Sequence, residues 1–305
     1  MSIIEKALNK ALELEQSSTN KKADQQNFPE RLENIEAAEP VPEPTRKATA
    51  EASKIHSIGW SHLREKGMLG PEMAYSQIAE EYRLIKRPLL MNAFPDGDNG
   101  LSRANLILVT SSVPGEGKTF TAVNLALSIA MERDKTVLLI DADVAKPSIA
   151  ELLGIPAKIG LTDLLQDKSI RFSDVLIKTD IPNLTLLPAG KLDRHSTELL
   201  ASDAMKRLAN ELSARYPDRV VIFDSPPLLA ASQGSVLATL VGQVVLVIES
   251  ESTPQYIVQE AISKLESCEV IGCVLNKTKK GFGFRYYGYG YGYGYGSYGQ
   301  QRTDG

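Results

Sequence analysis

The chain has 305 residues, of which 43% are hydrophobic and 24% charged, so it can bury a sizeable core. Its net charge of −4 excludes the basic face that phosphate backbones require, and no nucleic-acid partner is expected. No apolar run approaches the roughly 18–20 residues that cross a bilayer, and the N-terminus lacks a signal-peptide pattern. The sequence therefore predicts a cytoplasmic protein.

Residues 1–16 predict an amphipathic helix, because apolar residues such as Ile4, Leu8 and Leu12 share one helical face. This helix is either a frayed terminus or a docking helix for a partner. Residues 17–69 are polar and contain the proline-spaced run EPVPEP, a composition that buries too little to fold. They predict a flexible linker.

Residues 70–280 predict one α/β domain. A helix is expected at 74–92, with Pro88 kinking or interrupting it. Short apolar runs then alternate with helical patterns, which favours a doubly wound, mostly parallel sheet with helices on both faces. The strands are expected at 105–110, 136–141, 184–188, 219–224, 243–249 and 269–276, and the helices at 118–132, 197–214, 232–240 and 254–266. Cys273, in the last apolar run, is expected to be a buried thiol.

The first strand leads into SSVPGEGKTF, residues 111–120, and then into a helix, which is the context of a Walker A loop and of a P-loop NTPase. Glycines here let backbone N–H groups approach phosphates at a helix N-terminus. Lys118 is expected to reach the β- and γ-phosphates and Thr119 to hold Mg²⁺. Ser112 stands where the usual pattern has its first glycine. The expected nucleotide contacts are Pro114, Gly115, Glu116, Gly117, Lys118, Thr119 and Phe120.

Three aspartates follow two other strands: Asp141 and Asp143 after one, and Asp224 after another. Open α/β sheets bind ligands at the carboxyl ends of their strands, so these carboxylates are expected to share one crevice. Thr119, Asp141 and Asp224 are the predicted metal ligands. GTP-binding proteins recognise guanine with the motif N-K-x-D, but the matching run VLNKTK has Lys279 where that motif needs Asp. Adenine is therefore favoured, the expected cofactors are ATP and Mg²⁺, and Asn276 is a candidate contact to the base.

Four motifs in order resemble those of the bacterial tyrosine kinases (BY-kinases) of polysaccharide export. TSSVPGEGKT covers 110–119, D-x-D is Asp141 and Asp143, DSPP begins at Asp224, and a tyrosine cluster covers 286–298. The chain looks most similar to the separate cytoplasmic kinases of exosortase-associated exopolysaccharide clusters. It departs from the pattern at two positions: Ala145 stands where the family usually has Arg, and Gln233 where an acidic residue often occurs.

The resemblance implies an ATP-dependent protein-tyrosine autokinase that regulates exopolysaccharide polymerisation or export. Its catalytic residues would be Lys118, Asp141, Asp143 and Asp224. Asp141 would serve as the base and Asp143 would orient the acceptor, or the two roles would be exchanged. The phosphoacceptors would lie in a flexible tail, residues 281–305, and are Tyr286, Tyr287, Tyr289, Tyr291, Tyr293, Tyr295 and Tyr298. The alternative is a P-loop ATPase that acts as a nucleotide-gated scaffold without phosphorylating tyrosine.

The resemblance also implies partners. The family's oligomer motif, E-x-x-R-x-x-R, is matched by Glu80, Arg83 and Lys86 and implies a ring-like homo-oligomer, the alternative being a solvated helix face. A membrane-embedded chain-length determinant (co-polymerase) protein would activate the kinase and hold it at the inner face of the cell membrane. A tyrosine phosphatase would oppose it.

Overall fold

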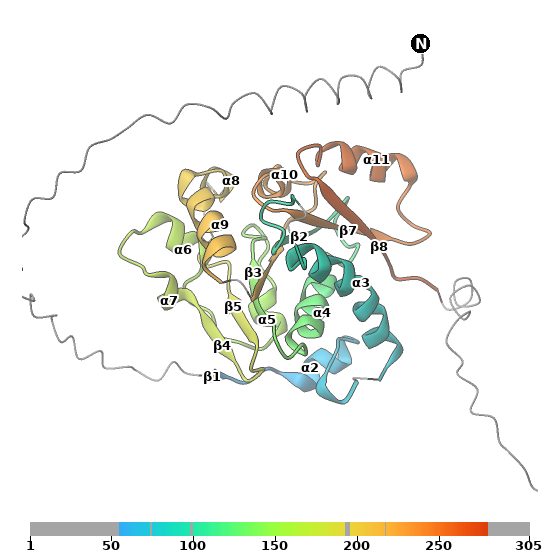
Figure 1. Ribbon diagram of the computed structural model, residues 1–305, viewed down its shortest axis with the longest axis horizontal. Helices are drawn as coiled ribbons and strands as arrows, with labels where there is room; N and C mark the ends of the chain where they lie inside the picture. Colours follow the sequence, from blue (N-terminus) through green and yellow to red (C-terminus); the bar gives the residue numbers. More distant parts are fainter. Residues whose placement is uncertain (1–54, 74, 98–99, 193–195, 217, 280–305) are drawn as a thin grey trace, which may run out of the picture. The chain divides into compact units, whose positions relative to one another are not determined.

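The structure is a computed structural model that describes residues 55–73, 75–97, 100–192, 196–216 and 218–279 (Figure 1). The predicted N-terminal helix, most of the predicted linker and the tyrosine-rich tail lie outside the described residues. Among the described residues, no helix is both long and apolar enough to span a membrane.

The sheet has eight strands in the order β1-β4-β5-β3-β6-β2-β7-β8. All neighbouring strands are parallel except β4 and β5, which confirms the predicted mostly parallel sheet. The strands are β1 (Ile55–His56), β2 (Leu106–Ser111), β3 (Thr136–Asp141), β4 (Ile177–Thr179), β5 (Leu184–Leu187), β6 (Arg219–Asp224), β7 (Gln243–Glu249) and β8 (Val270–Asn276). The six longest match the predicted runs; β1 and β4 are too short to show an apolar pattern.

Helices cover both faces of the sheet, as predicted (Figure 1). Successive strand residues point to opposite faces, so Ile107 and Val109 join one core and Leu106 and Leu108 the other. The first core packs against α2 (Trp60–Glu65), α3 (Gln77–Ala93), α4 (Lys118–Ala130) and α5 (Ile149–Leu152). The second packs against α6 (Leu161–Gln166), α7 (Phe172–Val175), α8 (Ser196–Leu200), α9 (Asp203–Arg215), α10 (Gln233–Ala238) and α11 (Gln255–Ser263).

The folded part begins earlier than the sequence predicted. Residues 55–69, assigned to the linker, form β1 and α2, and the 3₁₀ turn Pro71–Met73 follows. Leu63 and Leu69 are each only 1% exposed, and the Leu69 N–H donates to Asn124 Oδ1 of α4 at 2.7 Å. The apolar residues of this segment are scattered among polar ones, and they are buried in the core that they share with α4 and α5.

Two helix predictions also need correction. Pro88 does not interrupt helix α3, which continues to Ala93, because the buried face of the helix packs on the core and stabilises it where local propensity would end it. The single helix expected at 197–214 is divided into α8 and α9, and Ser202 caps α9 by accepting a hydrogen bond from the Met205 N–H at 3.2 Å.

Strand β8 lies at the edge of the sheet, which changes the environment of its last residues. The expectation that Cys273 is buried is wrong, because its side chain is exposed. Leu275, two residues later, is 63% exposed. An apolar run cannot distinguish an edge strand from a central strand, since only the central strand has neighbours on both sides.

Candidate nucleotide-binding and catalytic site

The predicted phosphate loop connects β2 to the N-terminus of α4. Gly115 and Gly117 adopt left-handed backbone angles, with φ of 93° and 99°, a conformation that residues with a Cβ rarely adopt. A Cβ on Gly117 would also overlap the side-chain amide of Asn276. The loop therefore presents bare backbone at a helix N-terminus, where N–H groups and the helix dipole attract anions.

The side chain of Glu116 stabilises the conformation of this loop. Its buried carboxylate accepts hydrogen bonds from the Val113 N–H at 2.8 Å, from the Glu249 N–H at 3.3 Å and from the Thr253 hydroxyl. Asn276 donates its side-chain amide to the Glu116 carbonyl at 2.8 Å. The ends of β7 and β8 thereby hold the loop in place. Thr253 is a residue that the sequence reasoning missed; its only signal is its place in the loop that follows a strand.

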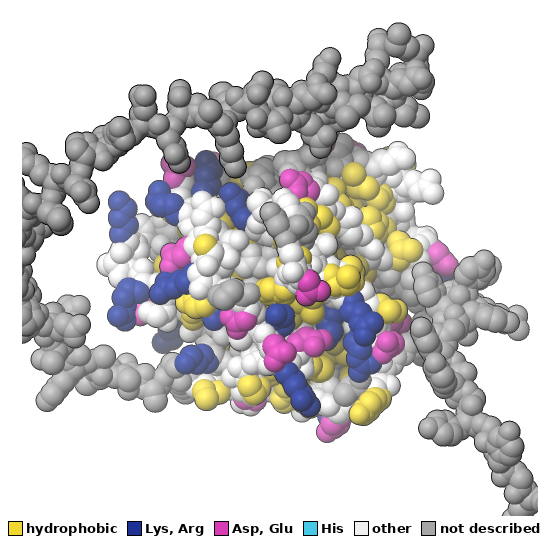
Figure 2. All heavy atoms as spheres, viewed as in Figure 1, with side chains coloured by type: hydrophobic (Ala, Val, Ile, Leu, Met, Phe, Trp, Pro, Cys, Tyr) yellow, Lys and Arg dark blue, Asp and Glu magenta, His cyan; other side chains and the backbone are white. Residues whose placement is uncertain are grey.

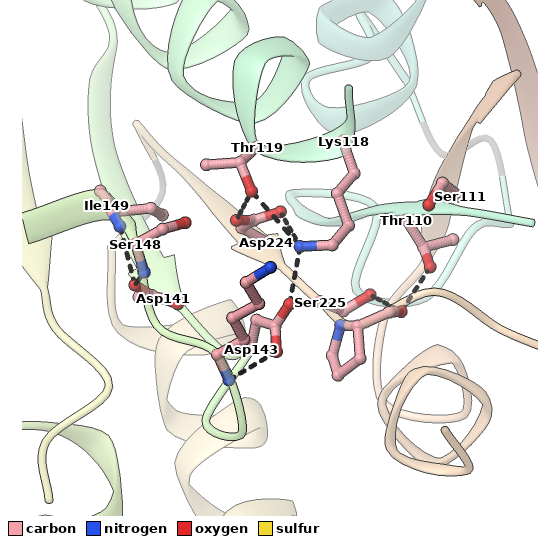
Figure 3. Close-up of polar contacts among 12 residues, drawn as sticks. Thr110, Ser111, Lys118, Thr119, Asp141, Asp143, Ser148, Ile149, Asp224 and Ser225 are labelled. Carbon is pink, nitrogen blue, oxygen red and sulfur yellow. Dashed lines mark hydrogen bonds and ion pairs between the residues drawn. The ribbon is translucent and has the colours of Figure 1, made fainter. Parts of the chain in front are cut away.

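The structure brings Lys118 together with the predicted acidic residues (Figure 3). Its Nζ lies 2.7 Å from Asp143 Oδ2 and 3.6 Å from Asp224 Oδ1. The Thr119 hydroxyl donates to Asp224 Oδ2 at 2.6 Å. Asp141 and Asp224 are register partners at the carboxyl ends of β3 and β6, which explains why residues far apart in sequence converge here.

The carboxylates are buried, and burial controls their ionisation. Burial raises the pKa of Asp224 to about 7, although the Lys118 ammonium and the Thr119 hydrogen bond act in the opposite direction. Burial also raises the pKa of Asp141 to about 6. Burial disfavours the charged form of Lys118, but the attraction of Asp224 and Asp143 outweighs it and the pKa of Lys118 is raised. A nearby divalent cation would favour the ionised carboxylates.

Asp141 and Asp143 have different partners. Asp141 Oδ2 accepts hydrogen bonds from the Ser148 and Ile149 N–H groups, at 2.9 and 3.0 Å, while its buried Oδ1 accepts none from the described residues. Asp143 uses Oδ2 for Lys118 and accepts from the Lys146 N–H through Oδ1 at 3.1 Å. Asp141 thus retains one uncommitted oxygen, whereas both oxygens of Asp143 are engaged.

Mg²⁺ fits this donor set only with help from a bound nucleotide. No group of three or more His, Cys, Asp or Glu side chains in the described part of the chain is arranged to hold a metal ion alone. However, the buried Asp224 Oδ1 lacks a hydrogen-bond partner among those residues, and its Oδ2 meets the Thr119 hydroxyl. Mg²⁺ commonly uses one or two protein oxygens and completes its octahedron with water and phosphate.

The remaining predicted residues are placed less centrally. Pro114 is exposed in the loop, and Phe120 packs against the core on the α4 side. On α3, Glu80 is exposed and Arg83 is partly exposed, and the two form an ion pair within that helix. Lys86 does not share their face: it is 7% exposed, and its Nζ bonds to the Ser128 carbonyl at 2.7 Å and Glu132 Oε1 at 2.6 Å. Its assignment as an oligomer contact is therefore wrong, because its charge is satisfied inside the subunit.

Comparisons with known proteins identify the family of this chain. The family model described as "AAA domain" matches residues 104–269, more than half of the chain. The tyrosine-protein kinase YwqD of Bacillus subtilis (strain 168) is 35% identical over 203 residues, covering 66% of this chain and 81% of YwqD. The crystal structure of the chimerical protein CapA2B2 is 29% identical with a TM-score of 0.62, covering 74% of this chain and 94% of that one. The VpsO kinase domain is 32% identical with a TM-score of 0.57, covering 72% and 98%. The chain therefore carries an AAA domain and belongs to the bacterial tyrosine-protein kinases.

Proposed function

We propose that this tyrosine kinase transfers the γ-phosphoryl group of ATP to tyrosines of its own tail, in the same or a neighbouring subunit. The observation that carries the proposal is the position of Lys118, between Asp143 and Asp224 and beside the Thr119 hydroxyl at the start of α4. Phosphoryl transfer depends mainly on positioning and on neutralising charge. When bound, ATP supplies the phosphoryl group and Mg²⁺ neutralises its developing charge.

The residues of the site would have different roles in this reaction. Backbone N–H groups of the loop and the Lys118 ammonium would bind the phosphates, and Thr119 with Asp224 would hold the metal ion. A tyrosine phenol, with a pKa near about 10, must lose its proton as its oxygen forms the new bond to phosphorus. Asp141 is the favoured acceptor of that proton, because it retains an uncommitted oxygen and its pKa of about 6 suits a base near neutral pH. Asp143 would orient the acceptor through Lys118, and Asn276 would contact the base from the end of β8.

The test uses the purified full-length chain with ATP and Mg²⁺. Lys118→Met should abolish tyrosine phosphorylation, detected by anti-phosphotyrosine blot and by mass spectrometry of the tail. Lys206→Met is a matched control, because Lys206 is exposed on α9 and pairs with Asp203 of the same helix at 3.2 Å. Label in both the wild type and the control supports the kinase. ATP hydrolysis without tyrosine label would instead support a nucleotide-gated scaffold.

The partners remain proposals that rest on the family resemblance. We infer that a membrane-embedded chain-length determinant protein activates this kinase and recruits it to the inner face of the membrane, where it regulates exopolysaccharide export. A tyrosine phosphatase would reverse the modification. The Glu80–Arg83 pair is the candidate contact of a ring-like oligomer, and Glu80→Arg should shift the assembly towards monomer in analytical ultracentrifugation. An unchanged sedimentation coefficient would count against that contact.

A further inference from the structure

An apolar groove lies beside the site, between α11 and the end of the edge strand β8. Its volume is about 550 Å³, and its apolar walls are Ile248, Val258 and Leu275. Polar side chains form the rest of its lining: Glu249, Ser250, Glu251, Thr253, Gln255 and Gln259. Leu275 is 63% exposed, and Figure 2 shows hydrophobic side chains at the surface over the region of α11 and β8. A single exposed leucine is ordinary, but one that lines a groove is a candidate contact surface.

We propose that this groove is the resting site of the unmodified tyrosine tail of the same chain, residues 286–298. The inference rests on the proposed function, since it concerns the segment that the kinase would phosphorylate. Leu275 is the second-last residue of β8, and the chain continues from there into the tail. A Gly-rich segment of about ten residues spans roughly 16–19 Å, so the first tyrosines begin within reach of the groove without help from a second subunit.

The pattern of the tail fits the surface that β8 presents. In an extended chain, the strict Tyr-Gly alternation from 289 to 295 places every ring on one face and only glycine on the other. Cys273 and Leu275 are likewise two residues apart and share a face of β8, and both are exposed. Strand β8 ends the strand order, so its outer edge has no strand partner within the described residues. An extended peptide can add to such an edge and place alternate side chains in adjacent pockets.

The chemistry of the lining suits tyrosine. A tyrosine ring buries an apolar body while its hydroxyl seeks a polar partner, and the groove offers aliphatic walls beside Gln255 and Gln259. Its rim is acidic, and the basic residues that lead into the tail already pair with it: Lys277 Nζ lies 2.9 Å from Glu249 Oε2, and Lys279 Nζ lies 3.2 Å from Glu251 Oε2. The first residues after β8 are thus held along this rim.

The aliphatic walls make the docking sensitive to modification. Each phosphotyrosine carries about −1.5 to −2 charges, and burying such a charge against Ile248, Val258 and Leu275 costs free energy because it loses its hydration there. Phosphorylation would therefore expel the tail from the groove, so that only unmodified tyrosines are stored there. The groove also adjoins the catalytic loop, because the Glu249 N–H and the Thr253 hydroxyl both donate to Glu116. Docking in the groove therefore places the acceptor tyrosines next to the loop that would bind the phosphates.

Cys273 provides a native reporter for this proposal. The full-length chain is treated briefly with N-ethylmaleimide, without ATP, and the labelled Cys273 peptide is quantified by mass spectrometry. The same measurement is made on a chain that ends at Lys279. A tail that lies along β8 and covers Cys273 four-fifths of the time slows labelling about fivefold, so truncation should accelerate it about fivefold. Leu275→Glu in the full-length chain should have the same effect, whereas Met91→Glu, a matched change at an exposed residue of α3, should have none.

The outcomes separate the alternatives. Equal labelling rates in the full-length, truncated and Leu275→Glu chains would overturn the proposal, and the kinase activity could stand regardless because the assay contains no ATP. Protection that persists in the truncated chain and grows with protein concentration would show that a second copy covers β8, which would also overturn it. Incubation of the wild type with ATP and Mg²⁺ should raise the labelling rate to that of the truncated chain. Unchanged protection of a chain shown by mass spectrometry to be phosphorylated would refute the release step.

Discussion

Replacing Asp141 with Asn should make the folded state less sensitive to pH. The Asp141 carboxylate is 1% exposed, and burial raises its pKa from 3.8 to about 6. Since one pKa unit corresponds to about 1.4 kcal/mol, keeping this carboxylate ionised in the folded state costs on the order of 3 kcal/mol at pH 8. The folded state holds the proton more tightly than the unfolded state, so stability rises as pH falls through about 6 towards 4.

The magnitude between two convenient pH values follows from this shift. Between pH 8 and pH 5 the wild type should gain about 1–2 kcal/mol of unfolding free energy from Asp141 alone. Asn at this position retains an oxygen for the Ser148 and Ile149 N–H groups but does not titrate. The N–H groups of the Asn side chain would be buried without an acceptor, which lowers the unfolding free energy by about 1–3 kcal/mol at every pH. The change in relative stability between the two pH values therefore reports the ionisation of the Asp141 carboxylate alone.

The assay is urea denaturation of the full-length wild type and the Asp141→Asn variant at pH 5 and pH 8, without nucleotide or Mg²⁺. Asp224, whose pKa is also raised, contributes with the same sign in both proteins, because burial is the largest cause of its shift and the charge of Asp141 is a lesser one. The stability of the variant relative to the wild type should be about 1–2 kcal/mol more favourable at pH 8 than at pH 5. A relative stability that is identical at both pH values would show that Asp141 is not held in a desolvated site, and the argument for it as a base would lose its physical support.

Three further substitutions test other parts of the structure. Gly117→Ala should weaken nucleotide binding by at least about tenfold in calorimetry, because a residue with a Cβ pays about 1–2 kcal/mol to adopt a left-handed backbone and the methyl group would displace Asn276. The control Gly97→Ala, where a Cβ would meet open space, should bind nucleotide normally, and equal binding by both variants would contradict the loop geometry. Thr119→Val should remove most of the Mg²⁺ dependence of nucleotide affinity, since the hydroxyl that meets Asp224 is lost; an unaltered Mg²⁺ titration would argue against Thr119 as a ligand. Leu69→Ala should lower the unfolding free energy by about 2–5 kcal/mol, whereas the exposed Leu84→Ala should change it by less than about 0.5 kcal/mol; similar small effects would mean that residues 55–69 are not part of the core.

Much of the architecture could be predicted from the sequence because its signals are local. Six strands appear as continuous apolar runs, and the phosphate loop is defined by glycines between a strand and a helix. Strand β2, the loop and α4 therefore lie where the pattern placed them. The carboxyl ends of parallel strands meet at one edge of the sheet, which is why Asp141, Asp143 and Asp224 could be assigned to one crevice before their distances were known.

Tertiary structure decided the features that depend on what packs against a residue. Leu69 is buried because α4 covers it, and Lys86 points inward because Glu132 and a carbonyl of α4 satisfy its charge. Cys273 is exposed because β8 has a neighbour on one side only. The difference between the hydrogen-bond partners of Asp141 and Asp143 likewise depends on the fold, since the N–H groups that donate to Asp141 come from the start of α5. Residue type and spacing in the sequence indicate which side chains can come together. Whether a side chain is buried, and which groups it forms hydrogen bonds with, depends on the elements that pack around it in the folded protein.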